Sequence, residues 1–86
     1  MAKRREEWCV ADDEREARLE GAATLYERAV FELERAAAHA ARAADHFRAG
    51  EVPRGTAHAW AAFGHVKAAE DGLLQQARDH RERSSA

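Results

Sequence analysis

Apolar and small residues recur along the first half of the chain in steps that alternate between four and three positions. This spacing places them on one face of an α-helix and matches the a and d positions of a heptad. A second stripe with the same spacing occupies the last third of the chain. The two stripes are Leu19, Ala23, Tyr26, Val30, Leu33, Ala37, Ala40, Ala44 and Phe47, then Ala59, Phe63, Val66, Glu70, Leu73 and Ala77. The pattern predicts two long amphipathic helices and no strands.

The segment RAGEVPRG separates the two stripes and predicts a tight turn. Gly50 suits the left-handed conformation that follows a helix end, and Pro53 suits the first turn of the next helix. If the stripes pair in antiparallel fashion about this turn, Ala40 lies opposite Phe63 and Leu33 lies opposite Glu70. Small residues then face large ones, as interdigitated packing requires. We therefore predict an antiparallel helical hairpin whose seam is formed by these stripes.

The expected organisation is all-α, with one hairpin domain over residues 12–82. It comprises a helix over about 12–49, a turn at 50–53 and a helix over about 54–81. Residues 1–11 either extend the first helix or form a short extra helix, and residues 83–86 are expected to fray. An alternative is that the first helix kinks or breaks at Gly21, and the chain would then form a three-helix bundle. Because a hairpin of this size buries one seam, we expect it to assemble into a dimeric or larger helical bundle.

Large apolar residues and a run of small residues also lie beside the predicted seam. Aromatic anchors next to small residues are typical of the buried centre of an interface. The residues expected at this interface are Phe31, Trp60, Gly64 and Leu74. The alternative interpretation is that Trp60 covers Ala41 of its own chain and that Leu74 is a solitary surface residue.

Four of the five histidines occupy c positions of the two heptads, so they are expected on one side of the hairpin. His46 and His58 share one level, and His39 and His65 share another. With Glu70, these imidazoles are candidate ligands for a transition metal or haem. Helix axes pack 8–10 Å apart, which predicts that two such histidines of one hairpin are too distant to share an ion. Solvent-exposed histidines are the simpler interpretation, because the chain lacks the Glu-x-x-His pairs of di-metal bundles.

Charge and composition narrow the function classes. The 86 residues carry 14 basic and 16 acidic side chains and a formal charge of −2, so no overall bias toward nucleic acid or membranes is expected. The stripe of Arg28, Arg35 and Arg42 is interleaved with acidic residues and predicts a solvated face. A single cysteine, Cys9, and an N-terminus without an apolar stretch predict a cytoplasmic protein.

No glycine-rich phosphate loop and no ordered Ser/His/Asp set is present, so the sequence favours a non-enzymatic role without deciding it. The expected function is that of a small oligomeric helical bundle that acts as a structural or protein-interaction module. Its expected partners are further copies of the chain or another protein, with no cofactor. The alternative is a metal- or haem-binding bundle that uses the histidines.

Overall fold

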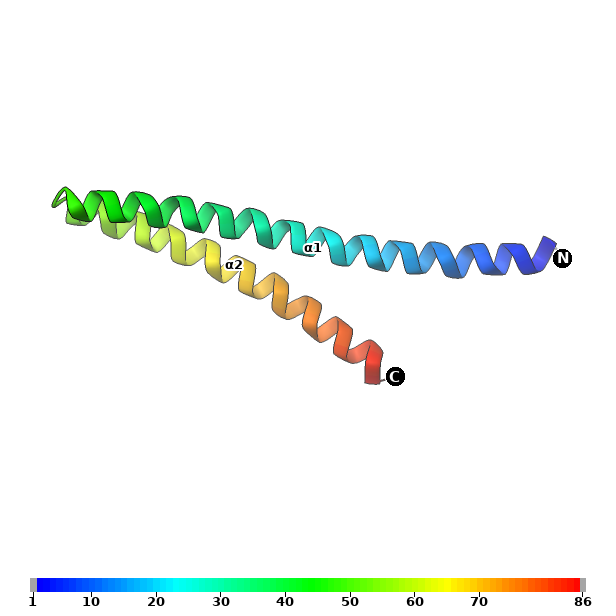
Figure 1. Cartoon of the computed structure of the whole chain (residues 1–86). Helices are drawn as coiled ribbons and strands as arrows, with labels where there is room; N and C mark the ends of the chain where they lie inside the picture. The colour runs from blue at the N-terminus through cyan, green and yellow to red at the C-terminus, as the bar shows by residue number, and fades with distance from the viewer. Residues whose placement is uncertain (1, 86) are drawn as a thin grey trace.

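The computed structural model is an antiparallel hairpin of two long helices (Figure 1). It describes residues 2–85, and the side chains of residues 12–82 within them. Helix α1 runs over Ala2–Arg48 and helix α2 over Val52–Ser85. The molecule is a rod of 73 × 24 × 12 Å, one helix layer thick. The predicted all-α hairpin is therefore confirmed.

The turn is closed by a regular helix C-cap. Gly50 adopts a φ of 76°, the left-handed conformation predicted from the sequence. Its N–H donates to the carbonyl of Phe47 at 3.0 Å, and the N–H of Glu51 donates to the carbonyl of His46 at 2.8 Å. These two bonds form a Schellman motif, which satisfies the last carbonyls of α1. Pro53 lies in the first turn of α2, where its missing N–H leaves no helix bond unmade.

Both helices extend beyond the bounds predicted from the sequence. Helix α1 is continuous through Gly21, so the chain forms two helices and not three. The helix also covers the segment 2–11, whose side chains, including those of Trp8 and Cys9, lie outside the described ones. Helix α2 continues to Ser85, and the fraying of the tail at 83–86 stays a prediction.

The seam between the helices differs from the predicted one. Residues that are buried or half-buried recur with heptad spacing one position before the predicted stripe on each helix. They are Ala22, Leu25, Ala29, Glu32, Ala36, His39, Ala43 and His46 on α1, and Gly55, His58, Ala62, His65, Ala69, Gly72, Gln76 and Asp79 on α2. One residue is about 100° of helix rotation. The predicted pairing of Ala40 with Phe63 is therefore wrong, and Phe63 is 62% exposed.

Side-chain volume explains this choice of seam. Among the described side chains, the buried apolar residues are four alanines: Ala29, Ala36, Ala43 and Ala69. Together with the buried Gly55, they present small surfaces from both helices at successive levels. Small residues on both sides let two helix backbones approach closely, and large side chains there would hold them apart. The alanine stripe therefore forms most of the contact within the hairpin, and most of the large apolar residues remain outside it.

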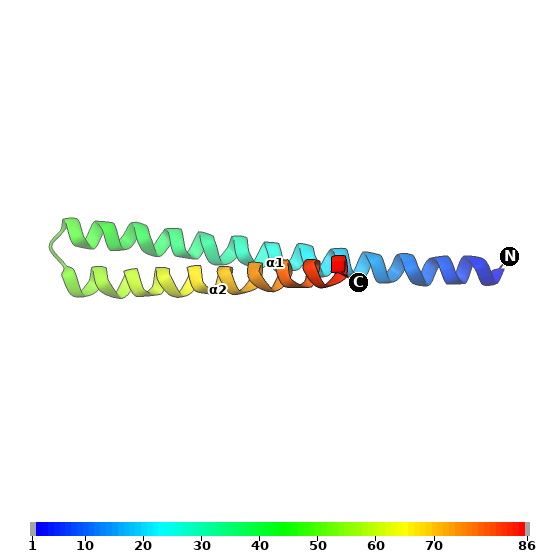
Figure 2. The same ribbon diagram turned by 90° about the horizontal axis from the view of Figure 1, so that it is seen from below.

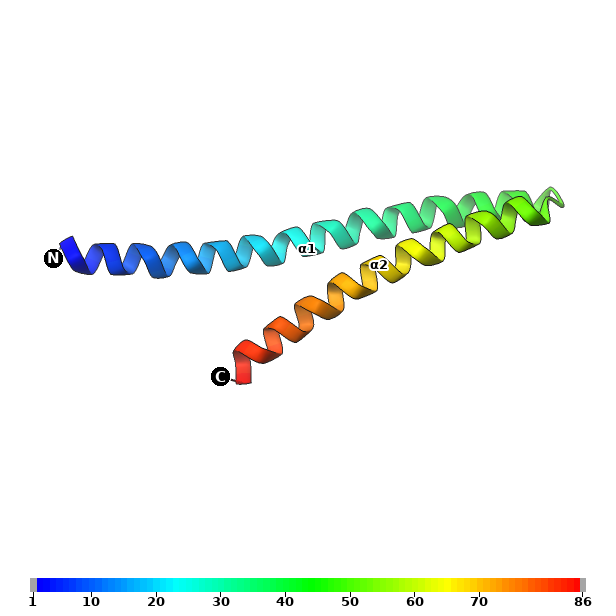
Figure 3. The same cartoon turned by 180° about the vertical axis from the view of Figure 1, so that it is seen from behind.

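The two helices diverge with distance from the turn. Figures 1 and 3 show them side by side near the turn and splayed toward their free ends. The N-terminal part of α1, drawn in blue, extends past the end of α2 in every view, including the one from below in Figure 2. The α2 seam becomes polar at Gln76 and Asp79, so little apolar surface holds that end against α1. Neither helix, over the residues described, contains an apolar stretch long enough to cross a membrane.

Candidate functional site

The most organised set of polar side chains is a column of four imidazoles along the seam. We call His39, His46, His58 and His65 the histidine column. At about 100° per residue, these c positions lie on the opposite side of the seam from the large apolar residues. The alanines between them bring the helix backbones together, so the rings from α1 and α2 meet across the groove.

Within the column, rings from the two helices lie parallel in pairs. His46 and His58 have ring centroids 5.1 Å apart and planes 9° apart. His39 and His65 have centroids 5.4 Å apart and planes 10° apart. These are the two pairs that the sequence places at common levels.

A third contact joins the two levels. The Nδ1 atoms of His39 and His58 lie 3.1 Å apart, and the ring centroids are 5.4 Å apart with planes tilted by 30°. One Nδ1–H donates to the other Nδ1, so one ring is protonated at Nδ1 and the other is not. The expectation that histidines of one hairpin are too far apart to share an ion is therefore wrong for this pair. The cause is the seam, which carries alanines and turns the c positions toward each other.

A carboxylate terminates the column at each end. His65 Nδ1 donates to Glu32 Oε2 at 2.6 Å, and His46 Nδ1 donates to Glu51 Oε1 at 3.3 Å. Glu51 also accepts a hydrogen bond from Arg54 at 2.9 Å, which anchors it in the turn. These bonds orient the outer rings, and the outer rings in turn stack on the inner pair.

The environment of the column disfavours a charge on His39. Burial in the groove lowers the pKa of His39 from its ordinary 6.5, and the neighbouring positive groups His58, His65, Arg42 and Arg35 lower it further. A neutral imidazole is the form that hydrogen-bonds to another neutral imidazole and the form that binds a metal ion. The local electrostatics therefore favour the ligand-competent state of His39.

Glu70, the remaining candidate metal ligand, is separated from the column. Its side chain is 63% exposed and pairs with Lys67 at 3.3 Å. Its position on α2 follows that of the buried Ala69, so it lies on the apolar side of the seam and not opposite Leu33 within it. Over the described side chains, no three His, Cys, Asp or Glu residues are arranged to hold one metal ion together.

The residues expected at an interface are all exposed, but they do not share one surface. Trp60 is 69% exposed and packs edge-on against Phe63, with centroids 6.0 Å apart. Trp60 and Leu74 adjoin the large apolar side chains along the outer edge of α2. Phe31 and Gly64 lie on the other side of the hairpin. There the Arg35 guanidinium is 5.3 Å from the centroid of the Phe31 ring.

Glu32 and Glu51 are the site residues that the sequence interpretation missed. Glu32 lies seven positions before His39, which is two full turns of the same heptad stripe, so its phase was a usable signal. Glu51 was assigned only to the turn, and no periodicity links it to His46. Its contact depends on the Schellman geometry, which folds the turn back over the end of α1.

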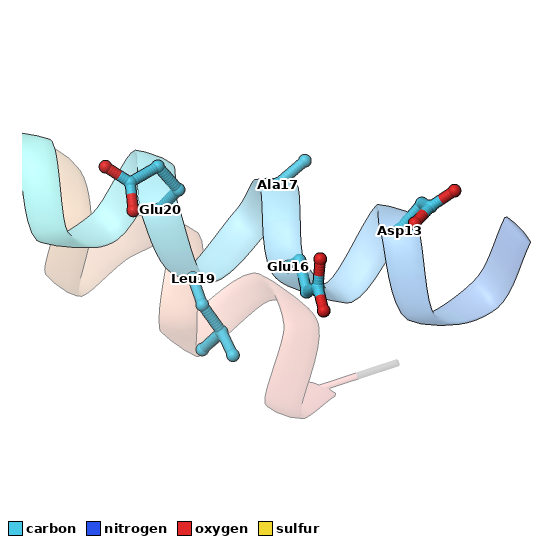
Figure 4. Close-up of a pocket in the computed structure, with 5 residues that line it drawn as sticks. All are labelled: Asp13, Glu16, Ala17, Leu19 and Glu20. Carbon is cyan, nitrogen blue, oxygen red and sulfur yellow. The ribbon is translucent and has the colours of Figure 1, made fainter. Parts of the chain in front are cut away.

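Two shallow hollows outside the column offer less organised chemistry. One of about 190 Å³ continues the histidine groove and is lined by Leu25, Arg28, Ala29, Glu32, Ala68 and Gly72. The other is lined, among the described side chains, by Asp13, Glu16, Ala17, Leu19 and Glu20 of α1 (Figure 4). It is an open and largely acidic surface.

Comparisons with known proteins give no family for this chain. No family of known proteins, no curated protein and no solved structure matches it.

Proposed function

We propose that the chain is a self-assembling helical-bundle module in which a second copy covers the large apolar residues. The observation that carries this proposal is an apolar face on a hairpin with almost no core. The face consists of Leu19, Tyr26, Val30, Leu33, Phe47, Val52, Phe63, Val66 and Leu73, each between 38% and 62% exposed. We call these nine residues the apolar face. Both helices contribute to it, on the side of the seam opposite the histidine column.

Energetics support a covered state for this face. Full burial of one large apolar side chain contributes about 1.5–3 kcal/mol, and each of these nine is roughly half-buried in the hairpin. Covering the rest would add on the order of 10 kcal/mol per chain. The hairpin itself buries four alanines, which is little to offset the entropy of ordering two long helices. Folding and assembly are therefore expected to be coupled.

Complementarity argues that the cover is a second copy of this chain. The middle of α1 presents the small residues Ala37, Ala40 and Ala44 on this side, and the facing stretch of α2 presents Phe63 and Val66. Turning a second hairpin over, with its turn at the same end, places α1 of one copy over α2 of the other. Small residues then meet large ones across a two-fold axis, the self-complementary arrangement of homodimers. The product is a four-helix bundle with the apolar faces as its core.

The histidine columns then lie on the two outer surfaces of the bundle. Together with the arginines beside them, they are the surfaces left to contact other molecules. The proposed role is structural or adaptor-like: a rigid rod that presents these surfaces in duplicate.

A matched pair of substitutions tests the assembly. Ala40 and Ala38 are both exposed and two residues apart on α1, but only Ala40 lies on the side of the apolar face. Ala40→Glu places a charge in the proposed core, whereas Ala38→Glu places the same charge on the outside. Light scattering should give wild type and Ala38→Glu a mass at least twice the 9.6 kDa of one chain. Ala40→Glu should reduce that mass or the helix content. A wild-type monomer at tens of micromolar contradicts the proposal.

A further inference from the structure

The two Nδ1 atoms of the central pair of the histidine column lie close enough together to bind one metal ion. We propose that His39 and His58 bind a late divalent transition-metal ion, Cu²⁺ most tightly, through their Nδ1 atoms. The site lies within one chain, on the surface away from the apolar face, so it does not depend on the proposed assembly geometry.

The separation of the two nitrogens carries the proposal. Imidazole nitrogens bind such metals at about 2.0–2.1 Å, so two nitrogens 3.1 Å apart subtend an angle of about 100° at the metal. That angle lies between those of square-planar and tetrahedral coordination. The two rings come from different helices, and the alanine seam fixes their spacing. The ring centroids are 5.4 Å apart, so the two Nδ1 atoms face each other head-on, and each ring must turn by about 40° for its lone pair to point at a shared ion.

The proton inventory is simple. In the metal-free hairpin, one ring carries a proton on Nδ1 and donates it to the other. Binding requires that ring to move its proton to Nε2, which frees both Nδ1 lone pairs for the metal and breaks the His–His hydrogen bond. Two neutral imidazoles and the ion therefore form the complex without an oxidant or reductant. This pair cannot hold a haem iron from both sides. The two axial nitrogens of a bis-histidine haem lie on opposite faces of the porphyrin, whereas the two Nδ1 atoms here face each other at 3.1 Å.

The rest of the column acts as a support for the chelate. His65 stacks on His39 and is held by Glu32, while His46 stacks on His58 and is held by Glu51. These outer rings position the inner ones and keep them from rotating out of the groove. They do not touch the metal, and no third protein ligand is required. Water or an external ligand completes the coordination sphere, as at open metal sites.

Charges around the pair act in opposite directions. Glu32 and Glu51 at the two ends attract a cation, and Arg35 and Arg42 on α1 repel it. The balance favours a metal of high intrinsic affinity for imidazole. Cu²⁺ leads the Irving–Williams order for nitrogen and oxygen ligands, whereas Mg²⁺ prefers oxygen ligands.

Calorimetric titration of Cu²⁺ into chelator-stripped full-length protein at pH 7.5 tests the site. The expected result is one ion per chain with a dissociation constant below about 10 μM. His58→Gln and His39→Gln should each weaken binding at least about tenfold, because loss of an outer-sphere partner alone costs 10–100-fold. His80→Gln is the matched control, since His80 is an exposed histidine of α2 outside the column, and it should leave binding unchanged.

A second measurement uses the wild-type protein and therefore does not depend on how well the variants fold. Titration of wild type with Zn²⁺, followed by NMR of the imidazole nitrogens, should shift Nδ1 of His39 and His58 and leave His80 in place. Binding weaker than about 100 μM, an equal loss in His80→Gln, or shifts confined to other histidines would overturn the proposal.

Discussion

The ring of Phe47 at the end of α1 lies directly over Gly55 in the first turn of α2. A Cβ atom on residue 55 would lie 2.8 Å from Cε2 of this ring and 2.9 Å from its Cδ2 and Cζ. An aromatic ring cannot bend away as a flexible chain end does, so glycine is required for the helices to close at the turn.

Gly55→Ala should therefore destabilise the hairpin by about 1–3 kcal/mol, the usual cost of overpacking. Gly21→Ala is the control, because a Cβ there meets nothing within 4 Å. Relieving a mid-helix glycine should stabilise α1 by up to about 1 kcal/mol. Chemical denaturation of both variants measures the difference. Equal effects of the two substitutions would mean that the Phe47 contact does not constrain the turn.

The alanine seam predicts opposite outcomes for two alanines four residues apart. Ala36 is buried between the helices at 6% exposure, whereas Ala40 is exposed on the other side of the seam. Ala36→Leu should cost about 1–3 kcal/mol by forcing the helices apart. Ala40→Leu should leave the contact within the hairpin unchanged, and any loss that it causes should come from the proposed core between two copies and depend on protein concentration. Thermal melts over a range of protein concentrations compare the two variants, and a larger, concentration-independent loss for Ala40→Leu would restore the seam predicted from the sequence.

The lowered pKa of His39 predicts acid sensitivity in the metal-free protein. Between its folded pKa and 6.5, the unfolded chain binds more protons at this residue than the folded one, so stability increases with pH there. The contribution of His39 is complete above about 6.5 and is lost as the pH falls below that value. The first cause of the lowered pKa is burial of the His39 ring. The second is electrostatic repulsion from the groups that face the ring, which are His58 and His65 on α2 and Arg42 and Arg35 on α1.

This pH effect is measured as a difference between variants. The total pH profile sums the contributions of every ionisable group in the chain, so it does not isolate one residue. Denaturation of wild type and His39→Gln at pH 5.0, 6.0 and 7.5, with a chelator present, should show a smaller loss at acid pH in the variant. Identical profiles would leave His39 without a role in the pH dependence.

Glu70 is a polar residue on the side of the molecule that the proposed partner covers. In a bundle the carboxylate of Glu70 loses water, whereas Lys67 is 56% exposed and keeps Asp71 as a second partner at 3.6 Å. Replacing Glu70 by an apolar residue therefore removes the cost of burying its carboxylate without leaving a buried, unpaired charge. Glu70→Leu should raise the free energy of unfolding by about 1–3 kcal/mol per chain. Asp71→Leu, at the neighbouring exposed position, should give no comparable gain. Stability of Glu70→Leu equal to wild type at high protein concentration would contradict burial of this position.

Local signals along the chain specify the helices, the turn between them and the membership of each stripe. Gly50 and Pro53 define where α1 ends and α2 begins, because their backbone limits act locally. Heptad spacing likewise places the histidines of each helix on one face, since residues seven apart lie on one face of a helix whatever it packs against. These features depend on neighbours along the chain and need no knowledge of the partner helix.

Which stripe of each helix faces the other depends instead on how the two helices pack. Adjacent stripes differ by about 100°, and apolar content alone favours the one that contains Leu33 and Phe63. The choice depends on both helices at once, because small residues must meet at every level before the backbones can approach. Alanines and Gly55 meet this condition and the large residues do not. The close approach of the helix backbones also brings the Nδ1 atoms of His39 and His58 to 3.1 Å from each other. This distance is set by the volumes of the side chains across the seam.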